Sequence, residues 1–351
     1  MLERPALSDD AIRRSILANY GVSVGSINFL PIGYDATASV FQLTGSDGTD
    51  YFLKTKTVPV ALAPLLVPHF LRDIGIEQVV APLTTLSGTL SAPMKDPFTA
   101  ILYPFVGGRM GANGGLSVEQ WTEMGQIVRG IHAVQLPSDL AAQMRREPFI
   151  PHEAKLAWAL HREIVTASYA DPINKELAEF WRGRGTEIEN IILRAEELGR
   201  MAQARQSNIV LCHADIHIFN VMVTPGGKIF IVDWDEAILA PKERDLIHLV
   251  AGTQPEGAAV PPTEFAFRQG YGPAQVEPVI LAFYRHEWAV QEIAQLGKQV
   301  LWSNEGAEMT RLDGLNRFRR LFNTGAEIEG AYRSDVQNGL IHRRLSRTII
   351  P

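Results

Sequence analysis

The chain has 351 residues, of which 46% are hydrophobic, and its 39 acidic and 33 basic residues give a net charge of −6. That length suits two lobes rather than one, and the acidic balance argues against nucleic acid as a partner and fits a cationic small molecule. The single cysteine, Cys212, excludes an internal disulfide. No apolar run approaches the roughly 18 residues of a membrane span, and the first residues do not resemble a secretion signal, so we expect a cytoplasmic protein.

The N-terminal part is predicted to be one helix followed by antiparallel strands. Ser8 can cap a helix over residues 8–20, and Gly21 follows its last turn. Apolar runs between turn residues predict strands over residues 27–31, 40–43, 51–54, 79–83 and 99–103. We therefore expect a small antiparallel sheet lobe over residues 1–105.

Beyond this lobe the chain becomes mainly helical. Ser117 and Gln120 form a capping-box pattern at the start of one helix. Helical periodicity predicts further helices over residues 153–168, 173–203, 276–302 and 304–322. We expect a larger, mainly helical lobe over residues 106–351, which makes the whole chain an α/β (α+β) protein with two lobes.

The most informative stretch covers residues 211–236, where polar residues stand at the ends of a predicted hairpin. His213, Asp215 and Asn220 come directly before the first arm, residues 221–223. After the turn Pro-Gly-Gly, the second arm leads straight into Asp233. A short hairpin brings its two outer ends together, so the sequence predicts that these polar side chains gather at one place.

Phosphoryl transfer explains this arrangement of residues. An Asp in a loop, such as Asp215, can orient an acceptor hydroxyl and take its proton. An Asn five residues later and an Asp at the end of the next strand can hold Mg²⁺ on a triphosphate. The pattern matches protein-kinase logic, with His-Ala-Asp in place of His-Arg-Asp. The alternative is a solvated hairpin edge, because Asp and Asn are common turn residues.

Several segments resemble the aminoglycoside phosphotransferase family of small-molecule kinases. The resemblance rests first on the stretch His213-Ala-Asp215-Ile-His217-x-x-Asn220 and on the later Ile-Val-Asp233-Trp-Asp. Two further stretches resemble the spectinomycin phosphotransferase branch of that family: Ala-Pro-Lys-Glu-Arg-Asp-Leu over residues 240–246 and Phe-Tyr-Arg-His-Glu over residues 283–287. The resemblance runs from the first helix to about residue 330 and implies a protein-kinase-like fold.

The resemblance also implies roles for individual residues around ATP and Mg²⁺. Asp215 would be the base, Asn220 and Asp233 the metal ligands, and Lys54 the clamp on the α- and β-phosphates. The loop between the first two strands would cover the phosphates through Thr37 and Ser39, although an ordinary hairpin loop is the alternative there. The connector between the lobes would bind adenine through Tyr103, Phe105 and Val106.

Two departures from the family pattern affect these expectations. Kinase-like folds hold the lysine with a Glu on a following helix, but residues 57–76 contain no Glu. A Gly usually precedes the metal-binding Asn, whereas this chain has Phe219. Because Gly serves where φ is positive or where a ligand comes close, Phe219 bears on the local geometry of the loop.

The expected acceptor is a compact hydroxylated cation, with spectinomycin-like aminocyclitols as the first choice and antibiotic resistance as the biological role. Carboxylates in excess of what the metal and Lys54 require attract protonated amines, and an aromatic face can add to this. The candidate acceptor-binding residues are Asp215, Asp235, Glu236, Tyr284 and Glu287. Asp235 and Glu236 could instead only cap the following helix, and Tyr284 could be part of the core.

Two alternative functions stay open at the level of sequence. A metabolic kinase for choline, homoserine or a sugar would share every catalytic residue and differ only in its acceptor. A nucleotide-binding module without catalysis would fit the missing Glu and Phe219, while the intact Asp215, Asn220 and Asp233 oppose it.

Overall fold

The computed structural model describes residues 3–33, 35, 37–249, 262–273, 275–302, 307–337 and 339. The chain packs into two compact units. The first comprises Met1–Arg146, Val210–Leu239 and Pro262–Pro273, and the second comprises Glu147–Ile209, Ala240–Pro261 and Ala274–Pro351. The division of roles between an N-terminal nucleotide-binding lobe, residues 1–105, and a C-terminal catalytic lobe stays a prediction, because packing does not show what each part binds.

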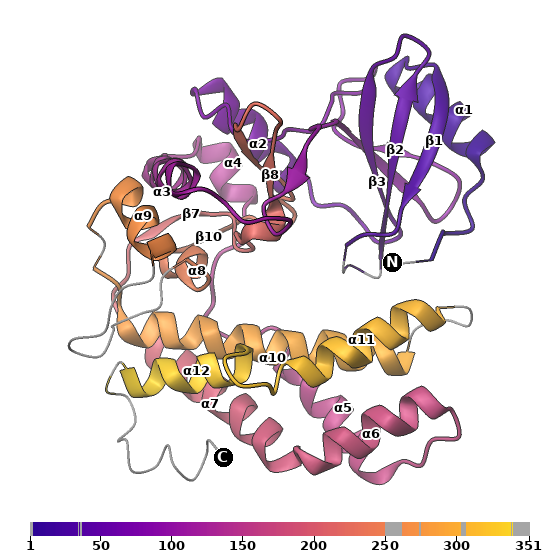
Figure 1. Ribbon diagram of the computed structural model, residues 1–351. Helices are drawn as coiled ribbons and strands as arrows, with labels where there is room; N and C mark the ends of the chain where they lie inside the picture. The colour runs from indigo at the N-terminus through magenta and orange to yellow at the C-terminus, as the bar shows by residue number, and fades with distance from the viewer. Residues whose placement is uncertain are drawn as a thin grey trace. The chain divides into compact units, whose positions relative to one another are not determined.

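A five-stranded antiparallel sheet and one helix form the beginning of the first unit, as the sequence predicted (Figure 1). The strands follow the order β1-β2-β3-β5-β4. Their bounds, with those of the helix, are α1 (Asp9–Tyr20), β1 (Val24–Leu30), β2 (Ala38–Gly45), β3 (Asp50–Lys56), β4 (Ala92–Pro93) and β5 (Thr99–Pro104). The register pairs Val40 with Lys54 across β2 and β3, and Lys54 with Ile101 across β3 and β5. Lys54 thus lies on a central strand.

Helix α1 forms where the capping residues predicted it. The Ser8 side chain accepts a hydrogen bond from the backbone nitrogen of Ala11, and Gly21 ends the helix with φ 69°. Ile12 and Ile16 are fully buried and pack in one core cluster with sheet residues such as Phe41. The apolar face of the helix therefore packs against the sheet, in a core that also includes Leu53 of β3.

The strand predicted over residues 79–83 is wrong. Val79 makes only an isolated bridge to Ile231, and the edge of the sheet is formed by the short strand β4. The backbone at the start of this segment instead bonds to the hairpin: Ile231 donates to the carbonyl of Gln78 at 2.7 Å and Val80 donates to the carbonyl of Ile231 at 3.2 Å. At its end, Leu83 donates to the carbonyl of Leu102 on β5 at 2.6 Å. A short apolar run shows that a segment is buried but not which backbone it pairs with.

The rest of the first unit builds the surroundings of the hairpin. A three-stranded sheet has the order β6-β8-β9, and β7 pairs with β10. The bounds are α2 (Ala63–Asp73), β6 (Arg109–Met110), α3 (Val118–Ala133), α4 (Ser138–Gln143), β7 (Ile209–Cys212), the 3₁₀ helix η1 (Ile218–Asn220), β8 (Val221–Val223), β9 (Ile229–Ile231), β10 (Ile238–Pro241) and α9 (Pro262–Tyr271). The capping box of Ser117 and Gln120 is present at the start of α3.

The second unit is helical. Its helices are α5 (Ala154–Thr166), α6 (Pro172–Gly183), α7 (Gly185–Gln203), α8 (Glu243–Leu246), α10 (Pro278–Trp302), α11 (Glu308–Arg320) and α12 (Glu327–Gln337). Helix α10 packs against α5, α6, α7, α11 and α12 and is buried over most of its length. Trp181 and Phe318 stack in this core with their ring centroids 5.0 Å apart. The single helix predicted over residues 173–203 is in fact two, α6 and α7.

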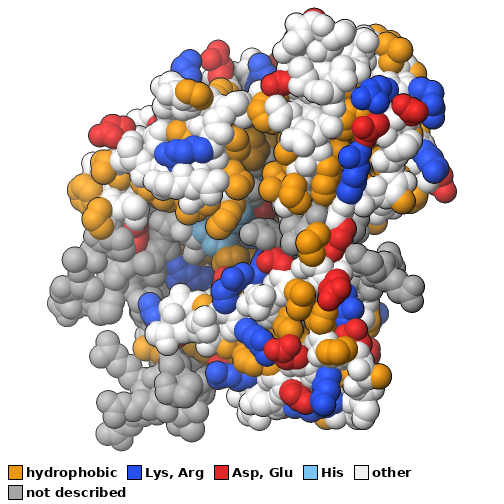
Figure 2. All heavy atoms as spheres, turned by 45° about the vertical axis from the view of Figure 1, so that its right-hand side comes forward, with side chains coloured by type: hydrophobic (Ala, Val, Ile, Leu, Met, Phe, Trp, Pro, Cys, Tyr) orange, Lys and Arg blue, Asp and Glu red, His pale blue; other side chains and the backbone are white. Residues whose placement is uncertain are grey.

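Two further features are the distribution of charge on the surface and the length and polarity of the helices. On the face drawn in Figure 2, acidic and basic side chains are interspersed rather than gathered into blocks of one sign. Among the described residues, every helix is too short or too polar for a membrane crossing.

Candidate active site

The hairpin that the sequence predicted is formed by β8 and β9. Val221 pairs with Ile231, and Thr224 closes the turn by a backbone bond of 2.9 Å to Lys228. At the open end, the nitrogen of Val232 donates to the carbonyl oxygen of Asn220 at 3.0 Å. Asn220 and Asp233 therefore stand next to each other although 13 positions separate them, as the spacing indicated.

His213 joins the loop before the hairpin to the strand after it. Its ring is fully buried, with Nε2 3.0 Å from the carbonyl oxygen of Val232. Its Nδ1 lies 3.3 Å from the backbone nitrogen of Asp215. Because that backbone group is a donor, Nδ1 must accept, and Nε2 then carries the proton and donates to Val232. No role was predicted for His213 from the sequence; its position two residues before Asp215 was the available signal.

Asp215 is held by two side chains while its carboxylate stays accessible. The amide nitrogen of Asn220 donates to Oδ2 of Asp215 at 2.8 Å, and Nε2 of His217 lies 3.2 Å from Oδ1. The Asp215 side chain is 41% exposed, so a hydroxyl can approach it from solvent. A fixed and accessible carboxylate is what a proton acceptor for a hydroxyl requires.

Backbone strain is concentrated at this site. Ala214 with φ 70° and Asp233 with φ 63° are two of the three non-glycine residues with positive φ in the described part of the chain. Such conformations are costly for L-residues and persist where the surrounding contacts impose them, often at functional sites. Phe219 is not among them; it lies within η1 with its side chain 48% exposed. The loop therefore does not need glycine's positive φ at that position.

Lys54 forms ion pairs with carboxylates that follow the second strand of the hairpin, and not with a residue on a helix. Its Nζ lies 2.8 Å from Oδ1 of Asp233 and 3.0 Å from Oδ2 of Asp235, and its side chain is only 10% exposed. Burial alone would lower the pKa of Lys54, but the two carboxylates outweigh burial and raise the pKa above its usual value. Lys54 is thus charged at neutral pH. Asp233 and Asp235 thus pair with Lys54, for which the kinase pattern has a Glu.

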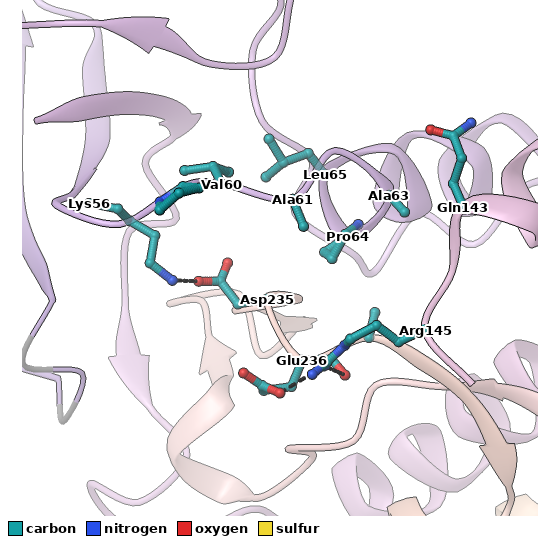
Figure 3. Close-up of a pocket in the computed structure, with 12 residues that line it drawn as sticks. Lys56, Val60, Ala61, Ala63, Pro64, Leu65, Gln143, Arg145, Asp235 and Glu236 are labelled. Atoms are coloured by element: carbon teal, nitrogen blue, oxygen red, sulfur yellow. Dashed lines mark hydrogen bonds and ion pairs between the residues drawn. The ribbon is translucent and has the colours of Figure 1, made fainter. Parts of the chain in front are cut away.

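Asp235 and Glu236 are both engaged in ion pairs. Nζ of Lys56 lies 2.5 Å from Oδ2 of Asp235, and Nη2 of Arg145 lies 2.8 Å from Oε2 of Glu236. Burial would raise the pKa of Asp235, but the two neighbouring lysines outweigh it and lower the pKa. Figure 3 shows these two ion pairs beside a pocket that residues of α2 also line. The volume of this pocket is about 200 Å³. The role of both residues in acceptor binding stays a prediction.

The residues predicted to contact the nucleotide lie in the loop before β2, on the strands of the first unit and on the connector after β5. The Thr37 hydroxyl is 2.6 Å from Oδ1 of Asp35, and the Ser39 side chain is buried at the start of β2. Tyr103, Phe105 and Val106 are partly exposed at and just after the end of β5. Their contacts with a nucleotide stay predictions.

Tyr284 and Glu287 lie in the second unit, on α10. Tyr284 is fully buried, and Glu287 is 3% exposed. Arg244 forms an ion pair with Glu287 and places its guanidinium 5.3 Å from the centroid of the Tyr284 ring. The two stretches that suggested the spectinomycin branch are therefore packed against each other. This arrangement presents neither side chain to solvent, so it does not support a direct contact with the acceptor, which stays a prediction.

The oxygen atoms at the open end of the hairpin fit a hard divalent cation. Asn220 uses its amide nitrogen for Asp215, which leaves the amide oxygen outside those bonds. The Asp233 side chain is 44% exposed, so its carboxylate is accessible. Carboxylate and amide oxygens are the ligands that Mg²⁺ prefers. The donor set of Asn220 and Asp233 is thus suited to Mg²⁺.

The sheet lobe, the buried lysine on β3 and the His-x-Asp loop before a hairpin together characterise a protein-kinase-like fold. Residues 28–294 match the phosphotransferase enzyme family. The chain belongs to this family, and it is an enzyme of the small-molecule kinase class.

Solved structures show the same similarity. A structure of spectinomycin phosphotransferase APH(9)-Ia in complex with ADP and spectinomycin is 28% identical, with a TM-score of 0.81, and the match covers 94% of this chain and 99% of that one. An amicoumacin kinase in complex with AMP-PNP, Ca²⁺ and its substrate is 17% identical over 90% of this chain and 92% of that one, with a TM-score of 0.56. The choline kinase LicA from Streptococcus pneumoniae is 15% identical, and the match covers 93% of this chain and 99% of that one, also with a TM-score of 0.56. These last two share the fold. A search among curated proteins gives no match.

Proposed function

We propose that the protein transfers the γ-phosphate of ATP to a hydroxyl of a small hydroxylated cation, with a spectinomycin-like aminocyclitol as the preferred acceptor. The observation that carries the transfer is the junction at the open end of the hairpin. There Asn220 holds Asp215, while Lys54 is paired with Asp233. A base, two oxygen ligands for a metal and a cation for phosphates are thus assembled by hydrogen bonds.

Each of these residues has one task in the proposed reaction. The Asp215 carboxylate accepts the proton of the acceptor hydroxyl as the hydroxyl oxygen bonds to the γ-phosphorus, while the bond between that phosphorus and the β–γ bridging oxygen breaks and ADP leaves. Lys54 binds the α- and β-phosphate oxygens and leaves its carboxylate partners when the nucleotide arrives. Asn220 and Asp233 hold Mg²⁺, which neutralises charge on the phosphates. Thr37 and Ser39 contact phosphate, and Tyr103, Phe105 and Val106 surround adenine.

The choice of acceptor is supported by the likeness to spectinomycin phosphotransferase, which extends over 94% of the chain at 28% identity. The net charge of −6 and the accessible Asp215 also favour a cation. Asp235, Glu236 and Glu287 add less attraction than their number suggests, because each already has a basic partner. An enzyme that phosphorylates such an antibiotic in the cytoplasm would confer resistance to it.

The acceptor is tested by incubating the purified protein with MgATP and spectinomycin and measuring the mass of the product. We expect a single added phosphate, and no product with the Asp215→Asn variant. Choline, homoserine and a neutral sugar serve as competing acceptors in parallel reactions. Phosphorylation of one of these without any spectinomycin product would contradict the acceptor and leave the kinase mechanism intact. Nucleotide binding without turnover on any acceptor would instead indicate a non-catalytic module.

A further inference from the structure

A second lysine lies beside Lys54 and bridges two carboxylates from different parts of the first unit. Lys56 is two residues further along β3, so both side chains leave the same face of the sheet. Its Nζ lies 2.5 Å from Oδ2 of Asp235 and 3.2 Å from Oδ2 of Asp35, and its side chain is 14% exposed. Figure 3 shows the side chains of Lys56, at the end of β3, and Asp235, after β9, pointing toward each other. Lys56 therefore connects the loop between β1 and β2 with the end of the hairpin.

Asp35 uses both oxygens of its carboxylate. Oδ1 accepts from the backbone nitrogen of Thr37 at 2.7 Å and from its hydroxyl at 2.6 Å, which closes a tight turn. Oδ2 faces Lys56. The pair between Asp35 and Lys56 is thus attached to the turn that places Thr37, and a change at Lys56 acts on this loop.

The charges explain why the bridge matters once a nucleotide binds. Asp35, Asp233 and Asp235 face two lysines, which leaves one surplus negative charge before any phosphate arrives. In the proposed function, Lys54 turns to the phosphates and Asp233 to the metal. Asp235 then keeps Lys56 as its basic partner among the ion pairs described, and so does Asp35. Loss of Lys56 would remove a positive charge that both carboxylates share, so the repulsion of the triphosphate would increase.

We propose that Lys56 is a positioning residue for the nucleotide: it ties the loop carrying Asp35 to Asp235 and compensates both carboxylates, so that the triphosphate can bind beside them. This inference rests on the proposed binding of ATP. It differs from the role of Lys54, because Lys56 acts through the two carboxylates and needs no contact with phosphate.

The test measures the dissociation constant of a non-hydrolysable ATP analogue with Mg²⁺ by calorimetry. Lys56→Met should weaken binding about tenfold or more, because it removes the positive charge that two carboxylates near the phosphates share. The double variant Lys56→Met/Asp35→Asn should recover a large part of that loss, since one of the two charges is gone. Lys56→Arg should bind nearly as well as the wild type. Lys175→Met, at an exposed lysine on α6, is the matched control and should change nothing.

Melting temperatures without nucleotide establish that each variant is folded. If Lys56→Met does not unfold cooperatively, Lys56→Gln takes its place in the same cycle. Binding by the Lys56 variant within about twofold of the wild type would overturn the inference, as would a double variant that binds no better than the single one. A wild-type protein that binds no nucleotide would instead overturn the proposed function, so the two failures are distinguishable.

Discussion

The side-chain nitrogen of Asn220 lies 2.8 Å from both the backbone oxygen and Oδ2 of Asp215. One amide group thus holds the proposed base with its nitrogen, while its oxygen is the proposed metal ligand. A change at Asn220 is therefore expected to affect both the proposed base and the proposed metal site. Such mutual support keeps reacting groups in position before the substrates bind.

Asp215→Asn should lower kcat by roughly 10²- to 10⁴-fold, because a positioned general base contributes about that much. The variant keeps an oxygen for the Asn220 amide, so the loop should hold its shape. The affinity for ATP should change little, since the proposed nucleotide contacts are made by other residues. Steady-state kinetics and nucleotide calorimetry together check this. A large loss of ATP affinity with kcat intact would contradict the role of Asp215.

Asp233→Asn should abolish turnover and weaken the Mg²⁺-dependent binding of nucleotide. The change removes one negative charge from the proposed metal ligand, which is worth several kcal/mol of transition-state stabilisation. Asn tolerates the left-handed conformation that Asp233 adopts with φ 63°, so the backbone should be preserved. Asp139→Asn, at an exposed position on α4, is the matched control. Near-normal activity with unchanged metal dependence would rule out Asp233 as a ligand.

The parts of the site that are close together in the sequence could be predicted from it. The hairpin and the gathering of Asn220 and Asp233 follow from turn residues and short spacings, and the structure confirms them. The partner of Lys54 could not be predicted, because the two residues of the pair with Asp233 are 179 positions apart. Only the tertiary fold brings them together.

Other differences have the same physical origin. The segment over residues 79–83 is apolar enough for a strand, but its neighbours in space decide that it bonds the hairpin instead. The helix that carries Tyr284 and Glu287, α10, was predicted correctly from the sequence. The spacing of two residues on a helix does not show, however, whether their face meets solvent or the core. The left-handed conformation of Ala214 has no signature in the sequence.

Gly108 should be intolerant of substitution, whereas its neighbour Gly107 should not be. Gly108 has φ 140°, and a Cβ atom there would collide with the backbone carbonyl of Val223 on β8. Gly107 has open space around it. We expect Gly108→Ala to lower the unfolding free energy by about 1–3 kcal/mol and Gly107→Ala to change it by about 0.5 kcal/mol or less. Denaturant titrations compare the two; equal effects would contradict the close approach of the connector to the hairpin.

Asp335 should be the main acid-sensitive group of the second unit. It is fully buried on α12, with its carboxylate 3.0 and 3.1 Å from two nitrogens of Arg194 and 3.3 Å from Nε2 of His286. Burial alone would raise the pKa of Asp335, but His286 and Arg194 outweigh it and lower the pKa below its usual value. A carboxyl group with a depressed folded-state pKa stabilises the protein above its unfolded pKa of about 3.9. This stabilisation is lost as the pH falls through the folded-state value.

Asp335→Asn should therefore destabilise the protein most at neutral pH, by about 2 kcal/mol or more, because it removes the buried one of the two carboxylates that pair with Arg194 and leaves only the exposed Glu197. The difference between the wild type and the variant should begin to shrink as the pH falls below the unfolded-state pKa of about 3.9, and it should disappear only below the lower folded-state pKa of Asp335. Melting temperatures measured from pH 7 to pH 3 check the trend. Glu179→Gln, in an exposed pair with Lys175, is the matched control and should leave the curve unchanged. A difference for Asp335→Asn that stays constant over this pH range would show that the ionised carboxylate is not what stabilises the helices.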